Sequence, residues 1–79
     1  MRYTDQARNN AITGTVALGL LFTADGRVIV EKVIRELPDG LTEQAIEAAQ
    51  KMRFKPAMKD GVAVNVRLTL EYTFGLPGR

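Results

Sequence analysis

The most regular pattern in the chain is the run Val62-Ala-Val-Asn-Val-Arg-Leu-Thr-Leu-Glu-Tyr-Thr-Phe74. Apolar residues occupy every second position from Val62 to Phe74, and the positions between them, from Ala63 to Thr73, are small or polar. A period of two places the two sets on opposite faces of a β-strand. This segment is therefore predicted to be one long strand, with its apolar face toward a core and its polar face toward water.

Two further strands are predicted nearer the N-terminus, joined by a hairpin. Residues 15–23 are largely apolar on both faces, which indicates a central strand, and residues 27–36 form its return strand. An Asp-Gly pair at positions 25–26 lies between them, and glycine readily adopts the positive φ that a tight hairpin turn needs. The alternation of the return strand is interrupted near Glu31 and Lys32, which a β-bulge would explain.

Two helices are predicted, one short and one long. Residues 4–11 are expected to form the short helix, with Thr4 or Asp5 as its N-cap. Residues 42–53 are expected to form the main helix, with Thr42 as its N-cap. The main helix carries an apolar stripe at helical spacing, formed by Ala45, Ile46, Ala49 and Met52.

The order of the strands follows from which faces meet water. Beside the second strand, residues 62–74 would pair in parallel and be buried on both faces, which their polar face argues against. Beside the first strand they pair antiparallel and leave one face wet. The predicted fold is therefore α+β, one domain over residues 1–79. Its three-stranded antiparallel sheet has the order 2-1-3, with the main helix on the apolar face and a short N-terminal helix.

The composition of the chain excludes several kinds of active site. Its 79 residues include no Cys and no His, which removes thiolate and imidazole metal ligands and the catalytic dyads and triads that use them. Glu43 and Glu47 are the nearest pair of acids on one helix face, and such exposed pairs are typical of a solvated surface. With a net charge of +2, the chain has one dense basic group, in residues 51–59, which suits a helix end. We predict no enzyme activity, no cofactor, no metal ion and no nucleic-acid partner.

Short motifs along the chain also follow the order and spacing of a known family. They are Tyr3, Ala7 and Arg8; Ile12, Gly14 and Val16; Asp25, Gly26, Arg27 and Val28; Leu41, Ala45 and Ala49; Arg53, Phe54, Pro56 and Ala57; and Gly61 with the strand to Phe74. Over almost the whole chain, this set resembles the C-terminal domain of TonB-like energy transducers.

The chain also departs from that family at four positions. Thr4 stands where Pro is usual, Thr42 where Asp is usual, and Met52 where Trp is usual. Glu31 stands where an apolar residue is common, which coincides with the interrupted alternation of the second strand. None of the four lies in the last strand.

The resemblance implies a role in transport across the Gram-negative cell envelope. The full protein would have an N-terminal membrane anchor that engages ExbB–ExbD, followed by a Pro-rich periplasmic spacer. The present domain would lie in the periplasm and bind the TonB box of outer-membrane transporters for iron chelates, cobalamin or similar nutrients. Strand addition at the final strand would then transmit energy derived from the proton-motive force.

The final strand is the candidate binding site because the predicted order places it at a sheet edge. Edge strands present unpaired N–H and C=O groups to which another strand can be added. We expect the polar face of the strand to select the peptide through Arg67, Thr69 and Glu71. The candidate partner-binding residues are Asn65, Val66, Arg67, Leu68, Thr69, Leu70, Glu71 and Thr73.

A second hypothesis uses the same edge for self-association. Two copies of the chain could pair their final strands as a homodimer, through a continuous sheet or an exchanged strand.

A further alternative is a sheet that binds RNA, which would need exposed aromatic residues on its central strands. Phe22, Tyr72 and Phe74 are predicted to face inward.

Overall fold

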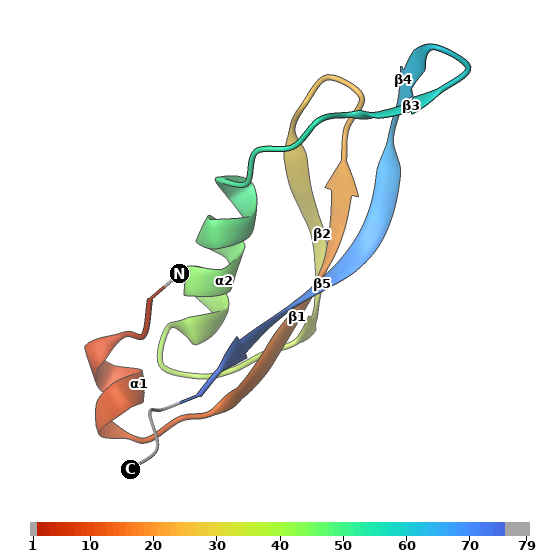
Figure 1. The fold of residues 1–79 in the computed structure, drawn as a ribbon. Coiled ribbons are helices and arrows are strands. Elements are labelled where there is room, and N and C mark those ends of the chain that lie inside the picture. The colour runs from red at the N-terminus through yellow and green to blue at the C-terminus, as the bar shows by residue number, and fades with distance from the viewer. Residues whose placement is uncertain (1, 76–79) are drawn as a thin grey trace.

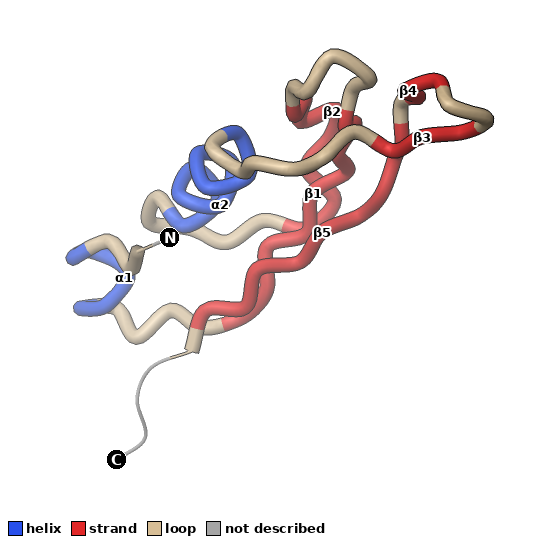
Figure 2. The backbone as a smooth tube through the Cα atoms, turned by 45° about the horizontal axis from the view of Figure 1, so that its top comes forward, coloured by secondary structure: helices blue, strands red, loops and turns tan. Residues whose placement is uncertain are grey.

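The structure, a computed structural model, describes residues 2–75, which form two helices on one face of a sheet and a small hairpin beyond one end (Figure 1). The elements are α1 (Asp5–Asn9), β1 (Gly14–Phe22), β2 (Val28–Arg35), α2 (Leu41–Gln50), β3 (Ala57–Lys59), β4 (Val62–Val64) and β5 (Val66–Phe74). The predicted α+β class and β-β-α-β core are confirmed. Both helices lie on the same side of the sheet, and its opposite face is left uncovered (Figure 2).

The strands of the main sheet are ordered β2-β1-β5, with both pairs antiparallel. This confirms the predicted order, in which the strand that is apolar on both faces is central. From Gly14 opposite Phe74 to Phe22 opposite Val66, the pairing of β1 with β5 runs without a register shift. The last strand of the sheet is therefore a regular edge strand.

The core is formed mainly between α2 and the central strand. Contacts of α2 with the sheet are concentrated on β1 and β2. Buried alanines on α2 allow a close approach of the helix to the sheet. The rings of Tyr3 and Phe74 meet edge to face at a centroid distance of 5.5 Å. The buried core residues are Ala7, Val16, Leu18, Leu20, Leu41, Ala45, Ala49 and Phe74.

The second strand contains two bulges where the sequence indicated one. Leu20 lies opposite Val30 and Gly19 opposite Lys32, so Glu31 is an extra residue in β2. This confirms the predicted bulge near Glu31. A second shift follows farther along, where Ile34 is the extra residue between partners of Leu18 and Ala17.

The hairpin between β1 and β2 closes through Thr23. Its backbone N–H donates to the carbonyl of Arg27 at 2.8 Å, and the N–H of Gly26 donates to the carbonyl of Thr23 at 3.1 Å. Gly26 has a φ of 90°, the positive value expected for a hairpin glycine. The Thr23 hydroxyl also donates to the carboxylate of Asp25.

The predicted N-cap of the main helix is wrong, whereas that of the short helix is right. α2 begins at Leu41 after Gly40, and Thr42 lies inside its first turn. The buried Thr42 hydroxyl turns back to Leu37, accepting from its N–H and donating to its carbonyl, both at 2.9 Å. In α1, the hydroxyl of Thr4 accepts from the N–H of Ala7 at 3.0 Å, as expected for an N-cap.

The prediction of one strand from Val62 to Phe74 is also wrong. The segment is divided at Asn65 into β4 and β5, and β4 pairs with β3, a strand that the sequence did not indicate. The division falls just before Val66, which pairs with Phe22, the last residue of β1, so the chain preceding Val66 has no partner in the main sheet. Asp60 and Gly61, with φ values of 52° and 79°, form the tight turn of the second hairpin.

Candidate functional site

The outer edge of β5 is the candidate site. Over nine residues, from Val66 to Phe74, the strand pairs on one side with β1, and on its other side no strand of residues 2–75 is bonded to it. An unpaired antiparallel edge of this length and regularity is the geometry that strand addition uses. The predicted position of this strand at the border of the sheet is confirmed.

The alternation of an antiparallel ladder determines which main-chain groups face outward. The N–H of Thr23 points toward the second strand, because it donates to the carbonyl of Arg27. Successive residues point to opposite sides, so Phe22 and every second residue before it point toward β5. Their partners, Val66, Leu68, Leu70, Tyr72 and Phe74, therefore direct their N–H and C=O groups to β1. The residues between these partners direct theirs to the open edge: Arg67, Thr69, Glu71 and Thr73.

These four residues also carry the polar side chains of β5. They lie on the uncovered face of the sheet, opposite the face that holds the buried Phe74. The hydroxyl oxygens of Thr73 and of Thr15 on the neighbouring strand lie 3.3 Å apart. Arg67 reaches across β1 to Glu31 on β2. The outward main-chain groups and the outward polar side chains thus belong to the same residues.

Asn65 differs from the other predicted site residues. It lies between β4 and β5 rather than in a strand. Its Oδ1 accepts a hydrogen bond of 2.7 Å from the N–H of Ala24, in the hairpin that joins β1 and β2. The side chain of Asn65 is therefore engaged within the domain, at the end of the edge rather than along it.

The remaining predicted residues of β5 could contact a partner only through their side chains, because their main-chain groups face β1. Val66, Leu68 and Leu70 bond to β1 through their backbones, and their side chains face the helical side of the sheet. Leu68 is 39% exposed there, although it faces the side that the helices cover, because α2 lies over the other two strands. Tyr72 on the same row is half-buried, and this burial raises its pKa above the ordinary value of 10.0. An apolar row therefore borders the open edge.

Sequence reasoning missed an apolar hollow at the start of β5. The hollow has a volume of about 230 Å³ and is lined by Phe22, Phe54, Lys55, Ala57 and Val66. The rings of Phe22 and Phe54 meet edge to face at 4.7 Å. The main helix was predicted to extend to residue 53, whereas α2 ends at Gln50, and Phe54 lies in the segment that crosses to β3.

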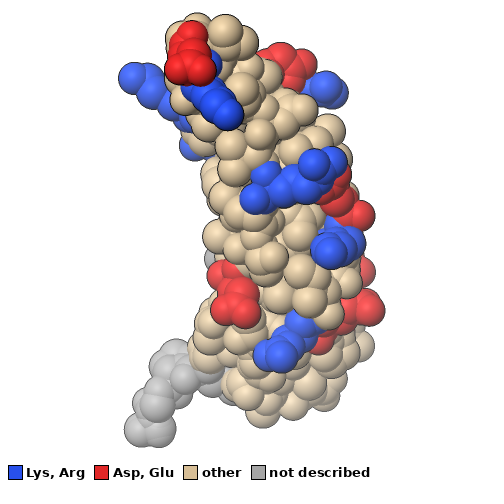
Figure 3. All heavy atoms as spheres, turned by 90° about the vertical axis from the view of Figure 1, so that its right-hand side faces the viewer, with Lys and Arg blue, Asp and Glu red and all other residues tan. Residues whose placement is uncertain are grey.

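The uncovered face carries a second, more polar hollow of about 360 Å³ above Gly19. Lys32 covers part of the glycine, since a Cβ placed there would lie 2.8 Å from its Cγ. Glu31, Arg67 and Thr69 line the remainder. On the side of the molecule that Figure 3 shows, basic and acidic side chains are intermixed along its whole length.

Two features are absent from residues 2–75. In this part of the chain, no three acidic side chains gather as they would to hold a metal ion. Nor is any helix within it long and apolar enough to cross a bilayer.

Comparison with known proteins identifies the family. The family model described as Gram-negative bacterial TonB protein C-terminal matches residues 1–76. The TonB protein of Vibrio cholerae is 32% identical over 78 residues, which cover 98% of this chain and 32% of that protein. The chain thus spans about a third of the length of this curated relative.

Solved structures agree with this assignment. The solution structure of the Helicobacter pylori TonB C-terminal domain is similar with a TM-score of 0.71 and 27% identity, covering 99% of this chain and 71% of that one. The Pseudomonas aeruginosa TonB C-terminal domain gives a TM-score of 0.65 and 26% identity, covering 99% of this chain and 80% of that one. The family match, the curated relative and the shared fold together show that this chain belongs to the family of TonB C-terminal domains.

Proposed function

We propose that this chain is the periplasmic recognition domain of a TonB-like energy transducer. Its partner is the TonB box of an outer-membrane transporter, an extended segment that adds to β5 as a fourth strand. The observation that carries the proposal is the unpaired, regular edge of β5. The domain acts in this proposal by binding, and no catalytic step is involved.

The main-chain groups of the edge supply the affinity. Arg67, Thr69, Glu71 and Thr73 each offer one N–H and one C=O to an incoming strand. A hydrogen bond of this kind contributes about 0.5–1.5 kcal/mol net, so several together offset much of the cost of ordering a short peptide. Because these bonds are formed side by side along the strand, a pull along its axis loads them together, which suits the transmission of force.

The remainder of the transducer completes the mechanism in this proposal. A membrane anchor outside the present sequence engages ExbB–ExbD, and a spacer connects the anchor to this domain. Movement driven by the proton-motive force then reaches the transporter through the added strand and allows nutrient import. This part of the proposal is supported by membership of the TonB family.

Peptide titration followed by NMR tests the binding step. We expect a TonB-box peptide added to ¹⁵N-labelled domain to shift the amides of residues 66–74 and to slow hydrogen exchange at Arg67, Thr69, Glu71 and Thr73. Exchange at Leu68 and Leu70 should change less, because their N–H groups already bond to β1.

A peptide of the same sequence, N-methylated at alternate positions, is the matched control. Methylation on the hydrogen-bonding side should abolish binding, and methylation on the other side should not. A titration that leaves all amides from 64 to 74 unshifted would show that the edge does not bind the peptide.

Self-association through the same edge is the alternative function, and the open edge of β5 favours it equally. Two copies that pair their edges would bury the four outward residues. Sedimentation at several concentrations separates the two functions. A tight dimer that excludes the peptide would make recognition secondary, whereas a monomer that binds the peptide supports the transducer.

A further inference from the structure

The bulged Glu31 of β2 makes a contact that the proposed function does not use. Its side chain lies over the uncovered face of the sheet, where it lines the hollow above Gly19 together with Arg67. Arg67 of β5 donates to it twice, from Nε to Oε1 at 2.9 Å and from Nη2 to Oε2 at 3.4 Å. The pair thus joins the two edge strands across β1.

The direction of Arg67 matters because this residue borders the open edge. The main-chain groups of Arg67 face the edge. A strand added to β5 would place one of its own side chains opposite Arg67, with the two Cβ atoms about 4.5–5.5 Å apart. In the present structure the guanidinium instead lies across the central strand toward Glu31. The Arg67 side chain is 73% exposed, so it is free to turn back toward an added strand.

From this geometry we propose that Glu31 competes with the bound strand for Arg67 and thereby sets the charge that the edge accepts. The inference rests on the proposed function, since it concerns a strand added to β5. A partner strand with an acidic residue beside Arg67 must displace Glu31 before it gains the guanidinium. A partner that is neutral at this position leaves the internal pair intact. Glu31 therefore reduces the preference of the edge for acidic segments.

The size of the effect follows from the exposure of the pair. Ion pairs this exposed are worth a few tenths of a kcal/mol to about one, which corresponds to a change in affinity of roughly two- to fivefold. We expect Glu31→Gln to raise the affinity for an acidic peptide by this factor and to leave the affinity for a neutral peptide unchanged. The gain should disappear at about 1 M salt, where the Debye length falls to roughly 3 Å.

The experiment uses nine-residue peptides with alternating apolar residues. In four of the peptides a single Glu occupies, in turn, one of the four positions between the apolar residues. In the fifth peptide all four of these positions are neutral. Each peptide is titrated against the wild type, Glu31→Gln, Arg67→Gln and the double variant. The gain from Glu31→Gln should occur for the peptide whose Glu lies beside Arg67, and it should be absent when Arg67 is Gln.

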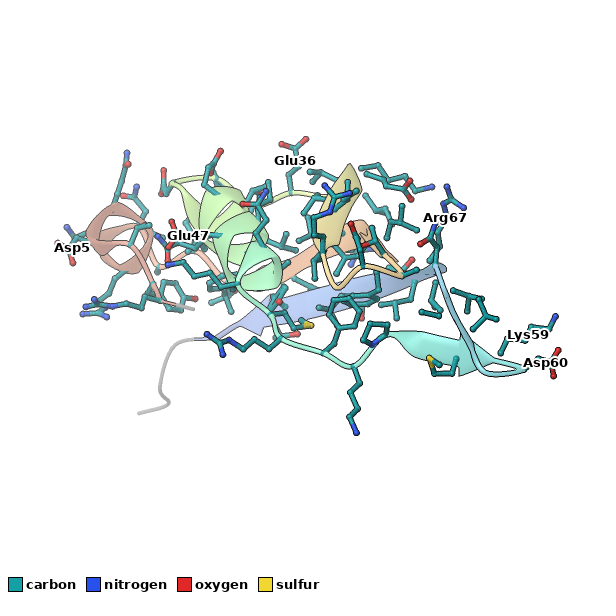
Figure 4. All side chains as sticks on the ribbon, turned by 90° about the horizontal axis from the view of Figure 1, so that it is seen from above. Asp5, Glu36, Glu47, Lys59, Asp60 and Arg67 are labelled. Carbon is teal, nitrogen blue, oxygen red and sulfur yellow. The ribbon has the colours of Figure 1, made fainter. Side chains whose placement is uncertain are left out.

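Glu36→Gln is the matched control because it removes the same charge near the end of β2. Glu36 is exposed and forms no ion pair among residues 2–75. In Figure 4 it lies well apart from Arg67. An equal gain from Glu36→Gln, or a gain that persists with Arg67→Gln, would mean that net charge alone is responsible and would overturn the inference.

The two levels of proposal fail in different ways. Peptides that shift the amides of β5 but bind Glu31→Gln and the wild type equally would overturn the role of Glu31 and leave the proposed function standing. Peptides that produce no shift in β5 with any variant would overturn both.

Discussion

β5 and β2 are the two edges of one sheet, and they pair with the same central strand in different ways. The ladder of β5 with β1 is unbroken over nine residues, whereas β2 is interrupted by bulges at Glu31 and Ile34. Bulges misalign the donors and acceptors that a further strand would need, and they are a common means of protecting an edge. The comparison indicates that the regularity of a strand decides which edge of the sheet is available to a further strand.

Apolar exposure alone would suggest the opposite choice of edge. β2 exposes Ile29, Val33 and Ile34, which are 38%, 37% and 51% exposed, whereas on β5 the large apolar residue exposed to this extent is Leu68. α2 also lies over β2 and β1, so that β5 is the less covered edge. Less cover by α2 and an unbroken ladder thus occur together at β5, and neither occurs at β2.

Proline substitutions along β5 should give the largest effect and separate its two sides. Leu70→Pro removes an N–H that bonds to β1 opposite Leu18, and we expect a loss of about 1–3 kcal/mol in the free energy of unfolding, because its acceptor on β1 is left unpaired. Thr69→Pro removes an outward N–H instead, a position where strands tolerate proline. This variant should stay folded and bind the peptide at least about tenfold more weakly. Urea unfolding and peptide titration measure the two quantities, and equal destabilisation by both variants would contradict the assigned alternation.

Deleting Ile34 should make the β2 edge more regular and so reduce its difference from the β5 edge. The deletion removes the second bulge, and we expect it to change the free energy of unfolding by about 1 kcal/mol. Self-association through β2 should then become detectable by sedimentation. The measurement is made in the Thr69→Pro background, where the β5 edge is blocked. If the protein remains monomeric with a repaired β2 ladder, bulges are not what keeps this edge unpaired.

Acid should slightly destabilise the hairpin between β1 and β2. Hydrogen bonds from Thr23 and Arg27 lower the pKa of Asp25 below its ordinary value of 3.8. The unfolded chain then binds this proton more readily, so the stabilisation is present above about pH 4 and is lost as the pH falls through the folded pKa. We expect Asp25→Asn to lower the Tm slightly at neutral pH, with a difference that vanishes in strong acid. The Asp25 side chain is exposed, so a large difference would contradict its assigned environment.

Much of the fold could be predicted because its signals are local. The alternation in residues 62–74 and the glycine turns are set by neighbours a few positions apart. The bulge at Glu31 was visible as an interruption of that alternation. Thr42 misled because a Ser or Thr before an apolar stripe resembles an N-cap, whereas its hydroxyl bonds to Leu37 in the preceding loop.

The candidate site was predicted as a run of strand residues, without distinguishing those whose main-chain groups face the open edge. Asn65 was included because it continues the alternation, yet its partner, Ala24, is 41 positions away. The hollow beside Phe54 depends on Phe22, which the sequence places in a different element. Contacts between residues this far apart depend on how the elements pack, and no local pattern reveals them.

The sequence by itself determined the class of the fold, the strand order and the position of the last strand at an edge of the sheet, since these follow from periodicity and from which faces are polar. Only the tertiary structure decided where β5 begins, which of its amides face outward and that Arg67 is held by Glu31. The reason is physical: β1 ends at Phe22, its hairpin with β2 sets the phase of the ladder, and the pairing of β2 and β5 on either side of β1 brings together two charges that lie 36 positions apart.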